Sequence, residues 1–222
     1  MKILESRILG FFLKLADLIL LNLLWLVCSL PVVTLGPATT AANYTAMKMV
    51  EDEGDGVARM FFRSFRLNLG QSLRLGLLFT VMGSVLGVDV YLCLYRLEME
   101  GQSKFMLLAV LFCLGLAFWM EMIYLWALLA RFHNSSKRAV ILAFMLSVKH
   151  WRQTVQILVE HIALAAVGVL CILYVPQLGI LFVIFGASLF FYSQAKILRP
   201  LLDGYIPKAG AEEKETDKNE IL

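Results

Sequence analysis

Charged residues are scarce in this sequence. Asp, Glu, Lys and Arg make up 17% of the 222 residues and hydrophobic residues make up 60%, whereas a typical soluble domain has about 25% charged residues. A chain of this length cannot bury such an excess of apolar side chains in a water-soluble core. The shortage of charge therefore excludes an ordinary soluble domain and indicates an integral membrane protein. The formal net charge of +3 gives no indication of a nucleic-acid partner.

Motifs for catalysis and cofactor binding are also missing. The sequence has no G-x-x-x-x-G-K-[ST] phosphate loop, no G-x-G-x-x-G dinucleotide fingerprint, no H-E-x-x-H zinc motif and no G-x-S-x-G nucleophile elbow. The three histidines, His133, His150 and His161, lie more than a helical turn apart, and the four cysteines stand singly. We therefore expect no metal site, no cofactor and no enzymatic activity.

Long apolar runs recur along the chain, and a helix of about 20 residues covers a bilayer core of about 30 Å. The sequence therefore predicts an all-α, polytopic transmembrane helical bundle over residues 1–200. No small-residue cleavage site follows the first run, so we expect a retained anchor. Residues 201–222 are charged and predict a disordered cytoplasmic tail. The five strong spans are Phe11–Leu30, Leu75–Tyr95, Phe105–Ala130, Ile157–Val175 and Leu178–Ala195.

The segment after the first span has several possible structures. Pro31 and Pro37 must interrupt the first helix, because proline removes a backbone donor and clashes with the preceding turn. The residues of Ala38–Val50 are small and weakly apolar. This segment could be a short sixth span, a re-entrant segment or a helix at the membrane surface.

Basic residues are grouped, and short loops rich in Lys and Arg stay in the cytoplasm. With five spans alone, the N-terminus would lie outside. If Leu35–Val50 crosses or re-enters the membrane, both termini and all three basic groups are cytoplasmic, and this is the topology that we predict. The groups are Arg59, Arg63, Arg66 and Arg74; Arg131, Lys137, Arg138, Lys149 and Arg152; and Lys196, Arg199, Lys208, Lys214 and Lys218.

The stretch before the second span predicts a basic amphipathic helix on the cytoplasmic surface of the membrane. Apolar residues recur there at every fourth position from Phe61 to Leu73, with arginines on the other side. Aromatic and arginine side chains are enriched at protein interfaces, and arginines also attract anionic lipids. The candidate docking or lipid-contact residues are Arg59, Arg63, Arg66, Phe61, Phe62 and Phe65. A weaker stripe, Val148, Trp151 and Val155, precedes the fourth span and suggests a loose internal repeat.

Five ionisable residues are predicted inside the spans. Asp89 lies toward the outer surface, and four lie toward the cytoplasmic third: Asp17, Glu121, Glu160 and His161. A charge near the bilayer centre costs about 2.5–3.5 kcal/mol on insertion scales, so it normally faces a partner or a cavity. We favour a structural role, in which Glu121 joins two helices through Lys14, Arg131 or His161. A substrate or ion site is the alternative.

Gly83 and Gly87 form a G-x-x-x-G pair within the second span. Small residues at this spacing let helix backbones approach closely. In a chain with several helices, packing within the molecule is favoured over a seam between two copies.

Three stretches resemble the YesL-like family of small bacterial membrane proteins. Residues 31–41, PVVTLGPATTA, are similar to its P-x-x-T-x-G-P-A-T-T-A pattern; residues 61–68, FFRSFRLN, to F-x-x-F-x-x-N; and residues 128–135, LLARFHNS, to L-x-R-F-x-N. The resemblance extends to about Pro200, and its first stretch is the most specific. The motif-turn residues are Pro31, Thr34, Gly36, Pro37, Thr39 and Thr40.

This resemblance implies a multi-pass protein of the bacterial cell membrane, without an established activity, often encoded beside carbohydrate ABC-transporter components. We therefore expect a non-enzymatic accessory protein of a carbohydrate ABC uptake system, with lipids and a permease or related membrane subunit as partners. The alternatives are a small permease with a polar site around Glu121 and a membrane signalling adaptor. The sequence does not indicate the oligomeric state.

Overall fold

The computed structural model describes residues 2–52, 54–96, 101–132 and 135–205, and these residues contain helices and turns but no strands. The prediction of an all-α chain is therefore confirmed for this part. The helices are α1 (Lys2–Ser29), the short 3-10 helix η1 (Val32–Thr34), α2 (Leu35–Val50), α3 (Val57–Tyr95), α4 (Gln102–Arg131), α5 (Ser136–Lys149), α6 (Trp151–Tyr174) and α7 (Pro176–Asp203).

Four helices among the described residues are long and apolar enough to cross a membrane. They are residues Leu9–Ser29 of α1 and the whole of α3, α4 and α6. These helices contain the first four predicted spans, except for the last residue of the first span, Leu30, and the last residue of the fourth, Val175. The fifth predicted span, Leu178–Ala195, lies in α7, which is not among these four. The chain is thus a helical protein with four helices whose length and composition would allow them to cross a membrane.

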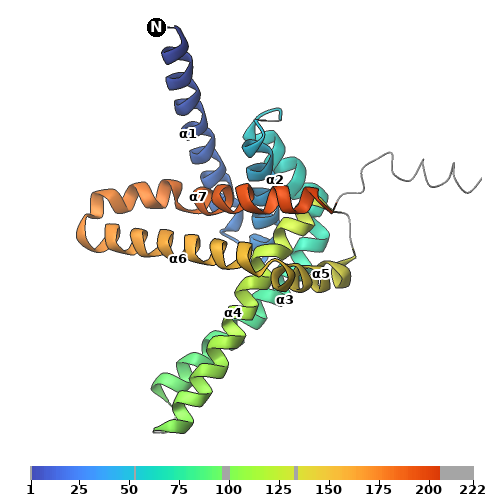
Figure 1. Ribbon diagram of the computed structural model, residues 1–222, viewed down its shortest axis with the longest axis vertical. Coiled ribbons are helices and arrows are strands. Elements are labelled where there is room, and N and C mark those ends of the chain that lie inside the picture. The colour runs from blue at the N-terminus through green and yellow to red at the C-terminus, as the bar shows by residue number, and fades with distance from the viewer. Residues whose placement is uncertain (1, 53, 97–100, 133–134, 206–222) are drawn as a thin grey trace, which may run out of the picture.

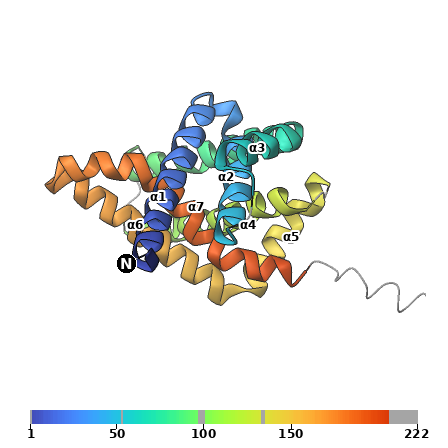
Figure 2. The same ribbon diagram turned by 90° about the horizontal axis from the view of Figure 1, so that it is seen from above.

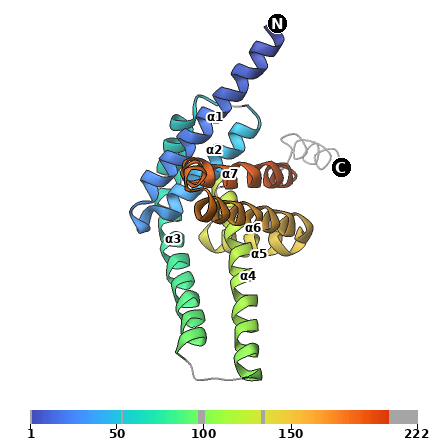
Figure 3. The ribbon, with the colours of Figure 1, turned by 90° about the vertical axis from the view of Figure 1, so that its left-hand side faces the viewer.

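The long helices do not stand side by side as in a parallel bundle. Helices α3 and α4 form one antiparallel hairpin, and α6 and α7 form another (Figure 1). The two hairpins leave the centre of the molecule in different directions, and the first half of α1 leaves in a third (Figures 1 and 3). The chain changes direction at His150, the single residue between α5 and α6, whose backbone is non-helical (φ −105°, ψ 44°).

Helix α2 lies where these arms meet and contacts α1, α3, α4 and α7 (Figure 2). Pro37 is tolerated in its first turn, because the amide of that position needs no partner within the helix. The residues of α2 are small enough for four helices to pack around it. This segment is therefore not an isolated helix, because it is enclosed by α1, α3, α4 and α7. Its buried residues are Gly36, Pro37, Ala38, Thr40, Ala41, Ala42, Asn43, Thr45, Ala46, Met47 and Met49.

The backbones of α2 and α3 approach each other closely at Gly36. A Cβ atom added to Gly36 would lie 2.9 Å from the Cα atom of Gly76 and would collide with the carbonyl oxygen of Ser72. Thr40 also reaches across this contact, because its Oγ1 lies 3.0 Å from Ser72 Oγ. The absence of a side chain at Gly36 is what allows α2 to lie against α3.

The basic stretch before the second span is not a separate surface helix. Residues 58–73 form the first half of α3, which continues without a break for 39 residues. Gly70 and Gly76 lie near the middle of α3, and isolated glycines do not end a helix. At about 1.5 Å per residue, the 39 residues of α3 form a helix longer than the thickness of a bilayer core (Figure 3).

The second half of the suggested repeat differs from the first. The corresponding stretch is divided between α5 and α6 by the break at His150. Val148, Trp151 and Val155 are exposed on these two helices. The two stretches therefore share an apolar pattern but not a common structure.

Candidate functional site

Among the described residues, the most deeply buried charged side chain is that of Arg199 on α7, which is 5% exposed. Its guanidinium forms an ion pair with Glu51 at the end of α2 and donates a hydrogen bond to the carbonyl oxygen of Met47. Asp203, one turn further along α7, has its Oδ2 3.6 Å from Arg199 Nε and also pairs with Arg131 at the end of α4. We call Glu51, Arg131, Arg199 and Asp203 the junction network, because it joins the ends of α2, α4 and α7.

A second group of polar side chains lies deeper between the same helices. Gln194 Nε2 on α7 donates to Asn43 Oδ1 on α2 at 3.2 Å and to the carbonyl oxygen of Ile123 on α4 at 2.8 Å. Asn22 Nδ2 on α1 donates to the carbonyl oxygen of Val183 on α7 at 2.9 Å. Hydrogen bonds of this kind hold helices together in a membrane. These amides are therefore engaged in joining helices.

Two threonines of the motif turn form side-chain hydrogen bonds, one within the turn and one between α1 and α2. Thr34 Oγ1 donates to the carbonyl oxygens of Cys28 and Pro31 at 2.7 and 2.8 Å, which closes the turn between α1 and α2. The indole of Trp25 donates to Thr39 Oγ1 at 3.3 Å. The motif turn thus sets the angle at which α2 returns beside α1.

The four ionisable residues predicted toward the cytoplasmic third of the spans do not gather in one place. Asp17 lines a cavity beside α7, whereas Glu160 on α6 accepts a hydrogen bond from Gln156 one turn earlier, at 3.1 Å. Glu121 is half-buried and has no hydrogen bond or ion pair within the described residues. The structure therefore gives no support to a single intramembrane polar centre around Glu121.

The three partners predicted for Glu121 are engaged elsewhere. Lys14 pairs with Asp52, and Arg131 pairs with Asp203. His161 packs its ring against Trp119 and Phe190. None of the three residues joins Glu121 to another helix.

His161 is the most enclosed of the predicted polar residues. It is 8% exposed, and its Nε2 is buried without a hydrogen-bond partner. It borders a cavity of about 290 Å³ that Asn43, Gln194 and Trp126 also line. An unsatisfied buried nitrogen costs about 1–3 kcal/mol. No group of three His, Cys, Asp or Glu side chains in the described part of the chain could hold a metal ion.

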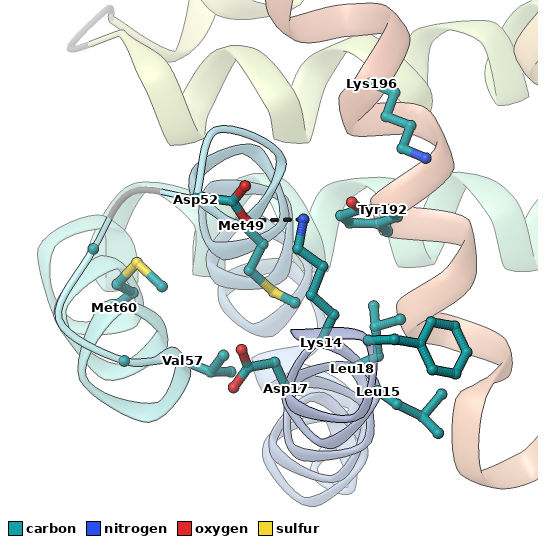
Figure 4. A pocket seen from close by; sticks show the side chains of 13 residues that line it. Lys14, Leu15, Asp17, Leu18, Met49, Asp52, Val57, Met60, Tyr192 and Lys196 are labelled. Carbon is teal, nitrogen blue, oxygen red and sulfur yellow. Dashed lines mark ion pairs between the residues drawn. The ribbon is translucent and has the colours of Figure 1, made fainter. Parts of the chain in front are cut away.

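A cavity of about 490 Å³ lies between α1, the α2–α3 turn and α7. We call it the α1–α7 cavity. Lys14 Nζ lies 2.9 Å from Asp52 Oδ1 across it, and Lys196 Nζ lies 4.7 Å from the centre of the Tyr192 ring (Figure 4). Asp17, three residues after Lys14, completes the charged lining. Sequence reasoning did not assemble this group, because no local spacing connects residue 14 to residues 52 and 196.

The candidate contact residues of α3 divide between surface and core. Phe61 is fully buried and stacks on Phe65 with ring centroids 6.2 Å apart, so its prediction as a contact residue is wrong. Phe65 is half-buried and packs against the core. Arg59, Phe62, Arg63 and Arg66 are exposed, and their spacing places them on one helical face. We call these four residues the basic-aromatic face.

Residues 18–90 match the model of a family described as "Protein of unknown function, DUF624". The match covers about a third of the chain and includes the end of α1 from Leu18 onward, all of α2 and most of α3. It contains the motif turn and the basic-aromatic face, and it is compatible with the YesL-like resemblance for this part. No curated protein and no solved structure gave a match.

Proposed function

We propose that this chain is a non-enzymatic accessory protein of the cell membrane that acts by contacting other membrane proteins. The observation that carries the proposal is the basic-aromatic face, where Arg59, Phe62, Arg63 and Arg66 are exposed together on α3. Arginine and aromatic side chains are enriched at interface centres. The buried amides and the junction network, by contrast, are occupied in joining helices.

The proposed partner is a permease or related membrane subunit of a carbohydrate ABC uptake system. This part of the proposal rests on the family resemblance, which concerns the motif turn and two further stretches. A small permease is a weaker proposal for this chain, because Glu121 does not line the cavity beside His161. The deeper amides Asn43 and Gln194 are hydrogen-bonded to each other.

The test of this proposal replaces Arg59, Arg63 and Arg66 together by glutamine. Removing three exposed interface cations is expected to lower co-purification of ABC permease subunits from native membranes by about tenfold or more. Quantitative mass spectrometry of the purified complex measures this ratio. The matched control replaces three other exposed residues, Lys137, Arg138 and Arg152, by glutamine. It should leave the amount of co-purified permease subunits unchanged.

Lipid attraction is the rival explanation for the basic-aromatic face. It predicts that the triple variant co-purifies the same subunits as the unmodified protein but binds anionic vesicles more weakly, in a salt-dependent way. That pair of results would contradict docking through this face. An equal loss of co-purification in the triple variant and in its control would also contradict docking through this face.

We further propose that both termini, the start of α3 and the α4–α5 connection face the cytoplasm. The ion pair between Lys14 and Asp52 supports this topology, because it sets the first half of α1 beside the α2–α3 turn. The pair between Arg131 and Asp203 likewise sets the end of α4 beside the end of α7. These contacts agree with the positions of the basic groups.

Single cysteines test the topology. In a chain whose four native cysteines are replaced, cysteine at Ser103 is expected to react with a membrane-impermeant maleimide on intact cells. Cysteines at Ser6 and Ser135 should react only after the cells are opened. Mass-tag labelling on a gel measures both. Strong labelling at Ser6 on intact cells would show that α2 does not return the chain to the cytoplasm.

A further inference from the structure

The α1–α7 cavity contains charges of both signs that are incompletely neutralised. Asp17 has no hydrogen bond or ion pair within the residues that the structure describes, although it lies in a helix that is apolar enough to cross a membrane. Lys196 Nζ lies over the ring of Tyr192 and contacts no described carboxylate. A charge in such surroundings needs water or a partner of opposite sign. One cavity thus offers both an anion and a cation for binding.

The cations gather on one side of the cavity. Figure 4 shows the ammonium group of Lys14, the Tyr192 ring and the ammonium group of Lys196 in sequence, with the carboxylate of Asp17 pointing away from them toward α3. The Lys14–Asp52 pair does not close this side, because both side chains are more than half exposed, at 51% and 70%. Exposed ion pairs are weak, so a phosphate can join or replace Asp52 as the partner of Lys14.

The rest of the cavity lining is apolar. Leu15, Leu18, Met49, Val57 and Met60 form much of its wall. Further along α1, C-terminal to Asp17, Leu20, Leu23 and Val27 are exposed to 39%, 48% and 63%. A charged recess beside an exposed apolar helix fits a molecule that has a charged head and apolar chains.

We propose that the α1–α7 cavity binds a zwitterionic phospholipid of the phosphatidylethanolamine class. The phosphate lies between Lys14 and Lys196, the ammonium group contacts Asp17, and the acyl chains lie along α1. The formal charges of Lys14, Asp17, Asp52 and Lys196 sum to zero, so a neutral headgroup with two opposite charges complements them better than a net anion does. The cavity volume of about 490 Å³ is within the usual range for ligand pockets of about 300–1,000 Å³. This inference does not depend on the proposed docking function.

The headgroup chemistry is tested first on the unmodified full chain in detergent. Short-chain phosphatidylethanolamine is expected to raise the thermal unfolding midpoint at lower concentration than phosphatidylcholine, whose ammonium has no N–H donor, or phosphatidylglycerol, which has no cation. Inorganic phosphate should have little effect. Equal effects of all three lipids, or an effect of phosphate as large as that of phosphatidylethanolamine, would overturn the proposal.

Two variants then assign the contacts. Asp17→Asn is expected to weaken the apparent affinity for phosphatidylethanolamine by about threefold to tenfold while leaving that for phosphatidylglycerol unchanged, because it removes only the ammonium partner. Lys196→Gln should weaken the apparent affinity for both lipids to a similar extent. The matched controls Asp89→Asn and Lys137→Gln remove exposed charges outside the cavity and should change neither. Retention of the full preference for phosphatidylethanolamine in Asp17→Asn would show that Asp17 does not recognise the ammonium group.

Discussion

Replacement of Gly36 by alanine is expected to lower the free energy of unfolding by about 3 kcal/mol or more, the upper end of the range for overpacked cores. The new methyl group would collide with the carbonyl oxygen of Ser72 and lie 2.9 Å from the Cα atom of Gly76. Both obstacles are backbone atoms, which cannot turn aside as a flexible side chain can. Helices α2 and α3 would have to separate, and α2 would lose contacts with its other neighbours as well. Thermal unfolding in detergent measures the loss.

Two glycines of α3 provide the control. A Cβ atom at Gly70 or Gly87 would meet no other atom within 4 Å, and alanine in a helix is favoured over glycine by about 0.5–1 kcal/mol. Gly70→Ala and Gly87→Ala should therefore leave the unfolding midpoint unchanged or raise it. If Gly36→Ala behaves like these two variants, the close contact of α2 with α3 is not a feature of the folded protein.

Replacement of Arg199 by methionine is expected to cost about 3 kcal/mol. Breaking a buried ion pair costs about 3–5 kcal/mol, because the remaining charge stays buried without its partner. The lower end applies because the Glu51 side chain is 33% exposed and can regain some water. Methionine keeps most of the length of the side chain, so the loss reports the guanidinium and its contacts with Glu51, Asp203 and the Met47 carbonyl. The unfolding midpoint in detergent is the measurement.

A double variant separates the ion pair from packing. Glu51→Gln in the Arg199→Met background removes the carboxylate that the first change leaves unpaired, so it should recover part of the lost stability. Lys137→Met, at an exposed position, should change stability by less than about 0.5 kcal/mol. A loss in Arg199→Met no larger than in Lys137→Met would contradict a structural role for the junction network.

Four of the five predicted spans correspond to helices long and apolar enough to cross a membrane. They could be predicted because a bilayer sets both the length and the composition of a crossing helix. The position of α2 could not. Its small, weakly apolar residues fit a surface helix or a buried one equally well, and its burial depends on α1, α3, α4 and α7 closing around it. Pro37 was predicted to interrupt the first helix, whereas in the structure it lies in the first turn of the following helix, α2.

Phe61 illustrates a second limit. The apolar stripe from Phe61 to Leu73 lies within one helix, α3, but such a stripe looks the same whether it faces lipid or protein. The structure buries Phe61 completely and leaves Phe62 42% exposed. The α1–α7 cavity shows the same limit over a longer distance, because Lys14, Asp52 and Lys196 meet only after the chain has folded.

The glycine pair in the second span was predicted to serve packing within the molecule. Gly83 does face another helix, since a Cβ atom there would lie 3.4 Å from the Phe118 ring, but Gly87 faces open space. The backbone contact that needs glycine joins Gly36 to Gly76, two positions 40 residues apart that belong to different helices. A spacing rule within one helix cannot identify such a pair.

The two hairpins also have a consequence for the bilayer around the protein. Because α3–α4 and α6–α7 leave the centre in different directions (Figure 1), they cannot both stand along the membrane normal, and at least one must be strongly tilted. Apolar helices whose length or tilt does not match the local thickness bend or thin the surrounding lipid, at a cost of fractions of a kcal/mol per Å. Two membrane proteins that share one deformed region of lipid reduce this cost, which favours their association.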